Sequence, residues 1–323
     1  MLVPAVGQEA KDHRGRFREI FCAALEARKE TAPDYRDCGQ ALTRVGREPD
    51  GSGKPVDLGP ANRKFTVVFA PGLGSDCFSG WLAEQDTIAR HLRRFGYDLI
   101  RVQSGGLSDS SGNGRRIRDV ILAQPSADQT PDLVLIGYSK GAVDSLQAVV
   151  DYPEIRSRLA AVVSIAGAIG GSPLANSASD AELNLMEYFP GSSCKPGGEG
   201  ALSDLRPATR KAWLAENRLP EQIPFYSVVT FPDPKRISGM LRPSYRKLSR
   251  VDARNDSQLI FYDQVIPGSY LTAYLNADHL AASVAIARTH EIIGELAADQ
   301  NDYPREVLFE ALLRLVEEDL TRR

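Results

Sequence analysis

The sequence predicts an α/β protein with a mostly parallel sheet wrapped by helices on both faces. Short apolar blocks of strand length alternate repeatedly with segments whose apolar residues recur at helical spacing. The 323 residues are 42% hydrophobic, which is enough for a large core, and they show no repeats. We therefore expect one main domain at residues 64–323, preceded by an N-terminal helical segment and linker at residues 1–63.

The individual elements are predicted from the period of their apolar residues and from the residues that end them. Gly96, for example, follows a helical pattern at the place where a helix end favours a left-handed residue. In chain order, we expect helices at 12–30 and 35–45, a strand at 65–70, a helix ending at Phe95, a strand at 97–103, a loop at 105–113, a helix at 114–124, strands at 133–136 and 159–169 with a helix at 142–151 between them, strands at 225–231 and 269–275, and a helix through 307–316.

The alternation of strands and helices stops between residues 171 and 221. This stretch is rich in Gly, Pro and Ser, carries scattered helical pieces, and is too long for an ordinary connection. Because it lies between two predicted sheet strands, we interpret it as an inserted cap over a site rather than as a linker.

A single hydroxyl stands at the sharpest predicted turn of the chain. The apolar strand that begins at Leu133 gives way at once to a helix, and Ser139 lies in the turn between them. Gly137 and Gly141 flank it, and a β-carbon at either place would crowd the neighbouring backbone. The pattern predicts that Ser139 is held outward in a strained conformation.

Three motifs in this order resemble the α/β-hydrolase family, and specifically its lipase- and esterase-like serine hydrolases. They are the PGLG loop at 71–74, the GYSKG turn at 137–141 and the NADHL segment at 276–280, and the resemblance covers roughly residues 64–295. The resemblance implies that Ser139 is a nucleophile. The alternative is a turn serine that carries no chemistry.

A serine nucleophile needs a base, and histidine has the pKa suited to that task near neutrality. His13 precedes the core, His91 falls in a helical pattern and is expected on its surface, and His290 falls in the helical run after the last strand. His279 follows that strand in a loop, where the family places its catalytic histidine. The alternative for His279 is a structural hydrogen-bonding role.

The acid that orients the base is harder to choose. Asp256 is our first choice, because it lies 23 residues before His279 in an NDSQL segment that resembles the acid loop of bacterial lipases. Asp263, in DQVIPG, is the second choice. Asp233 follows a strand at a permitted position, and Asp278 is adjacent to the histidine and is expected to point elsewhere.

The oxyanion of an acyl-transfer reaction needs two donors. By resemblance they are the backbone amides of Lys140 and Leu73, although this chain has Pro71-Gly72 where many relatives have His-Gly. The 71–74 loop is alternatively only a tight turn. The side chain of Lys140 is expected on the surface, and Cys77 is expected to be a buried small apolar residue rather than a nucleophile.

These residues together imply hydrolysis of carboxylic esters through an acyl-enzyme on Ser139, with a small-molecule or lipid ester as substrate. A thioesterase, an amidase or an acyltransferase uses the same machinery, and a non-catalytic member of the fold that binds a ligand or partner is a further alternative. Apolar cap residues suit an acyl group or form the core of the cap: Leu183, Leu185, Met186, Tyr188, Phe189 and Trp213.

Composition excludes several other classes of protein. The formal net charge is −3 with interspersed signs, so nucleic acid is not an expected partner. Without a visible signal segment or membrane-spanning run, a cytoplasmic location is the default, although export by another route stays open. The four cysteines form no metal-binding pattern, and we expect no metal or cofactor; they are read as free thiols, with a Cys22–Cys38 bridge as the alternative. The sequence does not determine the oligomeric state.

Overall fold

A computed structural model describes residues 10–76, 85–125, 132–176 and 200–321. Within these residues, seven strands form one fully parallel sheet in the order β1-β7-β6-β5-β4-β2-β3. The strands are β1 Lys11–Asp12, β2 Thr66–Ala70, β3 Asp98–Arg101, β4 Leu133–Tyr138, β5 Leu159–Ile165, β6 Phe225–Thr230 and β7 Tyr270–Leu275. The predicted fold class is confirmed.

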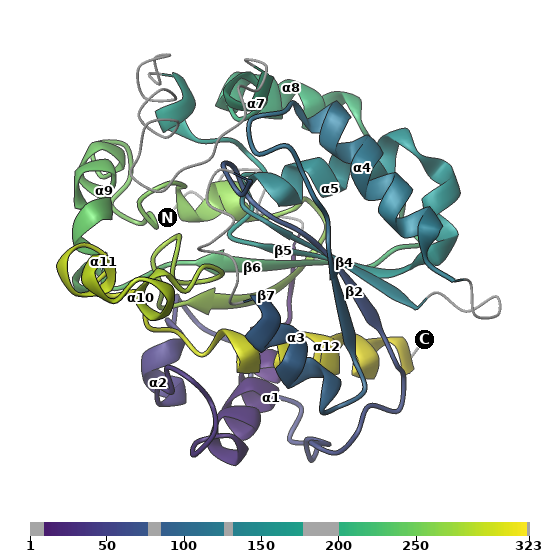
Figure 1. Cartoon of the computed structure of the whole chain (residues 1–323), viewed down its shortest axis with the longest axis vertical. Helices are drawn as coiled ribbons and strands as arrows, with labels where there is room; N and C mark the ends of the chain where they lie inside the picture. Colours follow the sequence, from purple (N-terminus) through teal and green to yellow (C-terminus); the bar gives the residue numbers. More distant parts are fainter. Residues whose placement is uncertain (1–9, 77–84, 126–131, 177–199, 322–323) are drawn as a thin grey trace.

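Helices lie on both faces of this sheet and beyond its ends (Figure 1). The α-helices are α1 Arg14–Ala27, α2 Cys38–Ala41, α3 Gln85–Arg93, α4 Ser110–Ala123, α5 Lys140–Asp151, α7 Gly200–Asp204, α8 Pro207–Glu216, α9 Arg242–Leu248, α10 Ile286–Thr289, α11 Glu291–Leu296 and α12 Arg305–Thr321. Among the short 3₁₀ helices are η4 Pro173–Asn176, η6 Gly239–Leu241 and η7 Phe261–Gln264.

The two faces of the sheet carry separate apolar cores. Val67 and Phe69 of β2 belong to the core under α1, α3 and α12, whereas Val68 and Ala70 belong to the core under α4 and α5. Successive strand residues point to opposite faces, so a strand covered on both sides must be apolar throughout. This requirement explains the continuous apolar blocks in the sequence.

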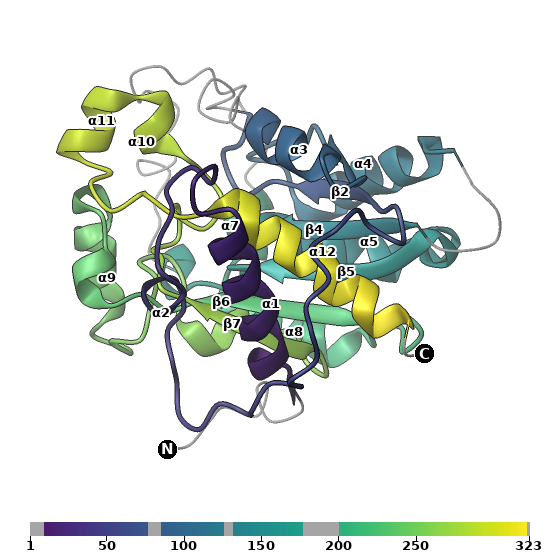
Figure 2. The same cartoon turned by 90° about the horizontal axis from the view of Figure 1, so that it is seen from below.

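The N-terminal segment is part of the main body. The strand β1 pairs with β7, and the helix α1 packs against α12 and β7, as the view from below shows (Figure 2). Phe17 and Phe21 of α1 lie in the same core cluster as Val134 of β4. The residues on either side of the predicted boundary at 63 therefore share one core.

Two helices differ from the sequence-based prediction. The helix α4 begins at Ser110 rather than at 114, because the Asp109 side chain accepts a hydrogen bond from the Gly112 amide and caps the helix earlier. The helix predicted at 35–45 is only the single turn α2, after which Leu42 extends and forms a bridge with Leu275. Gly96 ends the α3 segment with φ of +91°, as predicted.

The described helices do not combine the length and apolar character needed to cross a membrane. The loops that leave β2, β4, β6 and β7 all start at the carboxyl ends of parallel strands, and these ends meet at one edge of the sheet. Ligands of open α/β sheets bind at this edge, in the crevice outside the strand ends. The residues singled out in the sequence follow these four strands.

Candidate active site

The turn between β4 and α5 holds Ser139 in a strained backbone conformation. Its φ of 54° and ψ of −120° are rare for a residue with a side chain, and such strain costs about 1–3 kcal/mol. The Ser139 amide donates to the Ile165 carbonyl at 3.1 Å, and the Ser139 carbonyl accepts from the Ala168 amide at 3.2 Å. These bonds to the last residue of β5 and to the loop after it hold the strained residue in place.

Glycine is required on both sides of this turn. A β-carbon on Gly137 would lie 2.6 Å from the amide nitrogen of Ala142, and one on Gly141 would lie 2.5 Å from the carbonyl oxygen of Pro71. Both distances are far shorter than atoms tolerate, so the helix could not approach the sheet so closely with alanine at either place. The crowding inferred from the sequence is present in the structure.

His279 lies in the loop after β7, and its ring reaches Ser139. The distance from His279 Nε2 to Ser139 Oγ is 2.9 Å, and that from His279 Nδ1 to Asp256 Oδ2 is 2.8 Å. A carboxylate only accepts, so Nδ1 carries the proton and Nε2 is left to accept from the serine hydroxyl. The three residues thus form a continuous chain of hydrogen bonds, although 140 residues separate the serine from the histidine.

A tight turn between residues 255 and 260 fixes the Asp256 carboxylate. Ser257 has φ of 86°, and the amides of Gln258 and Leu259 donate to Asp256 Oδ1 at 2.9 and 2.7 Å. The residue is fully buried. Its second oxygen is therefore aimed at the imidazole before any substrate arrives.

Two further residues that the sequence analysis missed also bind this carboxylate. The Thr230 hydroxyl donates to Asp256 Oδ2, and the Gln264 amide donates to the same oxygen at 3.3 Å. The Thr230 amide in turn donates to Gln264 Oε1 at 2.8 Å. Thr230 is the last residue of β6. A polar side chain at the end of an apolar strand was the sequence feature that could have identified it as a site residue.

Asp263, the second-choice acid, lies against Gly170. Its backbone carbonyl accepts from the Gly170 amide at 2.7 Å, and a β-carbon on Gly170 would be 2.6 Å from the Asp263 carboxylate. Burial raises the pKa of Asp263 to about 7. Of the two candidate acids, the structure brings Asp256 to the histidine.

The loop after β2 packs directly against the serine. A β-carbon on Gly72 would lie 3.1 Å from Ser139 Cβ, and the Gly74 amide donates to the Gly106 carbonyl at 3.1 Å. Lys140 is the first residue of α5, and the first amides of a helix have no acceptor within the helix. The amides of Lys140 and Leu73 thus belong to the two segments that meet at Ser139.

Solved structures supply an independent comparison. The crystal structure of the metagenomic carboxyl esterase MGS0156 matches 99% of this chain and 96% of its own, with 40% sequence identity and a TM-score of 0.90. The chain belongs to the lipase- and esterase-like α/β-hydrolases. No protein-family model and no curated protein sequence matches the chain.

More distant α/β-hydrolases share the fold alone. The mature form of the Bacillus licheniformis lipase BlEst2 matches 76% of this chain and 96% of its own at 20% identity, with a TM-score of 0.56. EstA from Clostridium botulinum matches 95% of this chain and 98% of its own at 11% identity, with a TM-score of 0.53.

The Lys140 side chain of this α/β-hydrolase is buried, and the prediction of a surface position was wrong. Its ammonium lies 2.6 Å from Asp144 Oδ1, and both side chains are at most 2% exposed. The Asn113 amide donates to Asp144 Oδ2 at 2.8 Å and to the Gly105 carbonyl at 3.1 Å. Burial raises the pKa of Asp144. The lysine turns inward because this carboxylate, one helical turn further on, needs a buried partner.

The other histidines lie outside the hydrogen-bonded chain of Ser139. His91 is buried, contrary to the predicted surface position, and its Nε2 lies 2.7 Å from the Glu310 carboxylate on α12. His13 Nδ1 lies 3.4 Å from Asp319, and His290 lies between α10 and α11. Helical periodicity could not reveal that α12 covers the face of α3 that carries His91.

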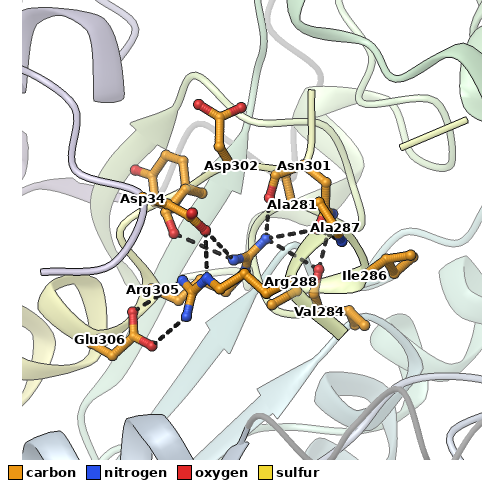
Figure 3. A network of polar contacts seen from close by, with 12 residues as sticks. Asp34, Ala281, Val284, Ile286, Ala287, Arg288, Asn301, Asp302, Arg305 and Glu306 are labelled. Carbon is orange, nitrogen blue, oxygen red and sulfur yellow. Dashed lines mark hydrogen bonds and ion pairs between the residues drawn. The ribbon is translucent and has the colours of Figure 1, made fainter. Parts of the chain in front are cut away.

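A network of two arginines anchors the segment that follows His279 (Figure 3). Asp34 accepts from Arg288 Nε at 2.7 Å and from Arg305 Nη1 at 3.1 Å, and Arg288 also pairs with Glu306 at 2.9 Å. Arg305 donates to the Val284 carbonyl at 3.1 Å. Burial lowers the pKa of Arg305 to about 10, so the guanidinium remains charged at neutral pH.

Asp34 belongs to a loop closed by a disulfide between Cys22 and Cys38, which was the alternative to free thiols. Arg36 of the same loop donates to the Asn276 carbonyl at 3.0 Å. The N-terminal loop therefore contacts the chain both before and after His279.

The described part of the predicted cap consists of η4, α7 and α8. The α8 residue Trp213 packs against the core under α4 and α5, and the Arg210 guanidinium lies 4.6 Å from its ring. The other apolar residues named for the cap lie outside the described residues, as do Cys77 and Cys194. No group of three or more metal-binding side chains occurs within the described ranges.

Proposed function

We propose that the protein hydrolyses carboxylic esters through an acyl-enzyme on Ser139. The observation that carries the proposal is the continuous hydrogen-bonded chain from Ser139 through His279 to Asp256, with distances of 2.9 and 2.8 Å. A serine hydroxyl is a weak nucleophile unless an adjacent base removes its proton. In this chain the base is in contact with the hydroxyl, and an acid holds the base in the required tautomer.

In the acylation step, Ser139 Oγ attacks the ester carbonyl while its proton passes to His279 Nε2. Asp256 accepts the hydrogen bond from Nδ1–H throughout and stabilises the positive imidazolium. The Lys140 and Leu73 amides donate to the oxygen on which negative charge develops, and one such donor is worth about 3–4 kcal/mol in the transition state. His279 then gives its proton to the departing alkoxide, and the alcohol leaves.

In the deacylation step, a water molecule takes the place of the alcohol. His279 removes a proton from the water, and the resulting hydroxide attacks the acyl carbon bound to Ser139. Collapse of the second tetrahedral intermediate returns the proton to Ser139 and releases the carboxylic acid. The enzyme thereby ends in its starting protonation state.

The ester class of substrate is supported by the 40% identical relative, which is a carboxyl esterase. Thioester cleavage, amide cleavage and acyl transfer to another alcohol use the same groups, so a substrate panel must separate them. We propose that the predicted cap at residues 171–221, of which residues 177–199 lie outside the described part of the chain, selects the acyl chain of a small-molecule or lipid ester. A series of p-nitrophenyl esters of increasing acyl length measures that selection.

We propose an oxidising compartment in place of the cytoplasmic default, and the disulfide supports this proposal. Disulfides persist in oxidising compartments and are rare where glutathione and thioredoxin keep thiols reduced. The Cys22–Cys38 bridge therefore favours an oxidising location over the cytoplasm.

Hydrolysis of p-nitrophenyl acetate by the purified protein tests the proposal. We expect turnover by the wild type, and a loss of about 10⁴-fold or more in kcat for Ser139→Ala and for His279→Ala, because the members of such a triad act as a unit. A folded wild type without turnover of esters, thioesters or amides would instead favour a non-catalytic binding role.

A further inference from the structure

Tyr138, the residue before Ser139, contacts the backbone of His279, whose imidazole is the proposed base. Tyr138 ends β4, and its hydroxyl donates to the backbone carbonyl of His279 at 2.8 Å. On the other side of the same residue, the His279 amide donates to the Asp256 carbonyl at 3.0 Å. The main chain of His279 is thus held at its N–H by the acid residue and at its C=O by the residue adjacent to the nucleophile.

The surroundings of Tyr138 keep its hydroxyl protonated, so that it acts as a hydrogen-bond donor. The side chain is 5% exposed, and a β-carbon on Gly72 would lie 3.1 Å from its ring. Burial raises the pKa of Tyr138 well above its usual value, and the nearby Asp256 and Asp278 carboxylates add to this effect. The phenol therefore stays protonated and acts as a donor.

Asp278, which precedes His279, also stabilises this loop, through hydrogen bonds that its carboxylate accepts. Its carboxylate accepts from the Ser238 amide at 2.9 Å and from the Ala281 amide at 2.9 Å. The first bond fixes the loop to the segment at Ser238 and the second closes the loop on itself, whereas the Tyr138 bond fixes it to the strand end that precedes the serine. Tyr138 thereby makes a link between base and nucleophile that the Asp278 carboxylate does not make.

We propose that the Tyr138 hydroxyl is a positioning group for catalysis, which sets the distance between His279 Nε2 and Ser139 Oγ by tethering the histidine backbone to the turn. The inference rests on the proposed function. Because Tyr138 and Ser139 are consecutive, this hydrogen bond must lengthen before the main chain of His279 can move away from the turn that carries the nucleophile. Proton transfer depends steeply on that distance, and a displacement of about 1 Å costs on the order of 100-fold in rate.

Tyr138→Phe is the direct test, because it keeps the ring and removes only the donor. We expect kcat for p-nitrophenyl acetate to fall about 10- to 100-fold while KM changes by less than about twofold, since the substrate does not touch the hydroxyl. The rate constant for labelling by a fluorophosphonate should fall by the same factor as kcat/KM, because both reactions need the same proton transfer.

Tyr303→Phe is the matched control. The Tyr303 hydroxyl is also buried and also donates to a backbone carbonyl, that of Ala41 at 3.0 Å, but it makes no contact with the histidine. Both variants lose one buried hydrogen bond of the same type. A kcat loss confined to Tyr138→Phe supports the proposal, and equal kcat values or equal losses in the two variants would overturn it.

Replacement of Tyr138 by 4-aminophenylalanine covers the case in which the phenylalanine variant does not fold. This residue keeps both the ring shape and an N–H donor, so kcat should remain within about threefold of the wild type. A folded 4-amino variant with a 10-fold or larger loss would contradict the tether. An inert wild type would instead refute the proposed hydrolysis itself, so the two failures are distinguishable.

Discussion

Removal of the Cys22–Cys38 disulfide gives the most quantitative prediction for stability. The bridge joins residues 16 positions apart, with their Cα atoms 5.2 Å from each other. Closure of a loop of this length lowers the entropy of the unfolded chain enough to stabilise the fold by about 3 kcal/mol. For a chain of this size that corresponds to a melting temperature lower by about 4–5 °C in the Cys22→Ser/Cys38→Ser variant.

Urea unfolding followed by circular dichroism measures this difference, and reduction of the wild type supplies the control. Dithiothreitol should lower the stability of the wild type to that of the double variant and leave the double variant unchanged. Because Asp34 and Arg36 lie in the closed loop, amide exchange should also quicken at residues 280–290. A double variant within about 0.5 kcal/mol of the wild type would refute the entropic reasoning.

Three further substitutions test the buried charges. Lys140→Met leaves the Asp144 carboxylate buried without its partner and should lower the free energy of unfolding by about 3–5 kcal/mol at pH 8. The double variant Lys140→Met/Asp144→Leu should recover most of this loss. A loss below about 1 kcal/mol in Lys140→Met would contradict a buried ion pair. Asp256→Asn should lower kcat about 10⁴-fold, as loss of the orienting acid does in serine proteases, whereas Asp263→Asn should have a kcat close to that of the wild type. The reverse result would assign the role of the acid to Asp263. Because burial raises the pKa of Asp263 to about 7, the native state holds a proton that the unfolded state has already released, so this residue lowers stability progressively between about pH 4 and pH 7. Asp263→Asn should therefore stabilise the protein at pH 8 by about 1–2 kcal/mol and much less at pH 4, as measured by thermal unfolding; an equal effect at both pH values would contradict the raised pKa.

Local patterns in the sequence were sufficient for the framework of the fold. The β4–α5 turn could be predicted because its two requirements, an apolar strand and glycine on both sides of Ser139, are written in neighbouring residues. The alternation of strands and helices predicted a parallel sheet for the same reason. The Asp109 cap was an equally local signal, and attention to it would have placed the start of α4 correctly.

Contacts between distant segments could not be predicted in this way. The helical period of residues around Phe17 indicates an amphipathic helix, but it does not say that α12 is the partner. The same limit applies to His91, whose partner Glu310 is 219 residues away, and to Tyr138, whose acceptor is 141 residues away. Spacing along the chain measures none of these distances, because they depend on how the elements pack.

The spacing of Lys140 and Asp144 in the sequence indicates their ion pair. An acid four residues after a lysine is the usual spacing for an ion pair on one helix face. Such pairs normally lie in solvent, which favoured a surface position for Lys140. Here the same face of α5 packs against the α4 segment, where Asn113 completes the pairing of Asp144.

The proposed hydrolysis requires that Ser139 is a nucleophile activated by His279. Incubation with a fluorophosphonate followed by peptide mass spectrometry tests it most directly, with His279→Ala as the comparison. We expect one adduct on the peptide that contains Ser139, formed rapidly in the wild type and far more slowly in the variant. An adduct on another residue, or a wild type that stays unlabelled while folded, would contradict it.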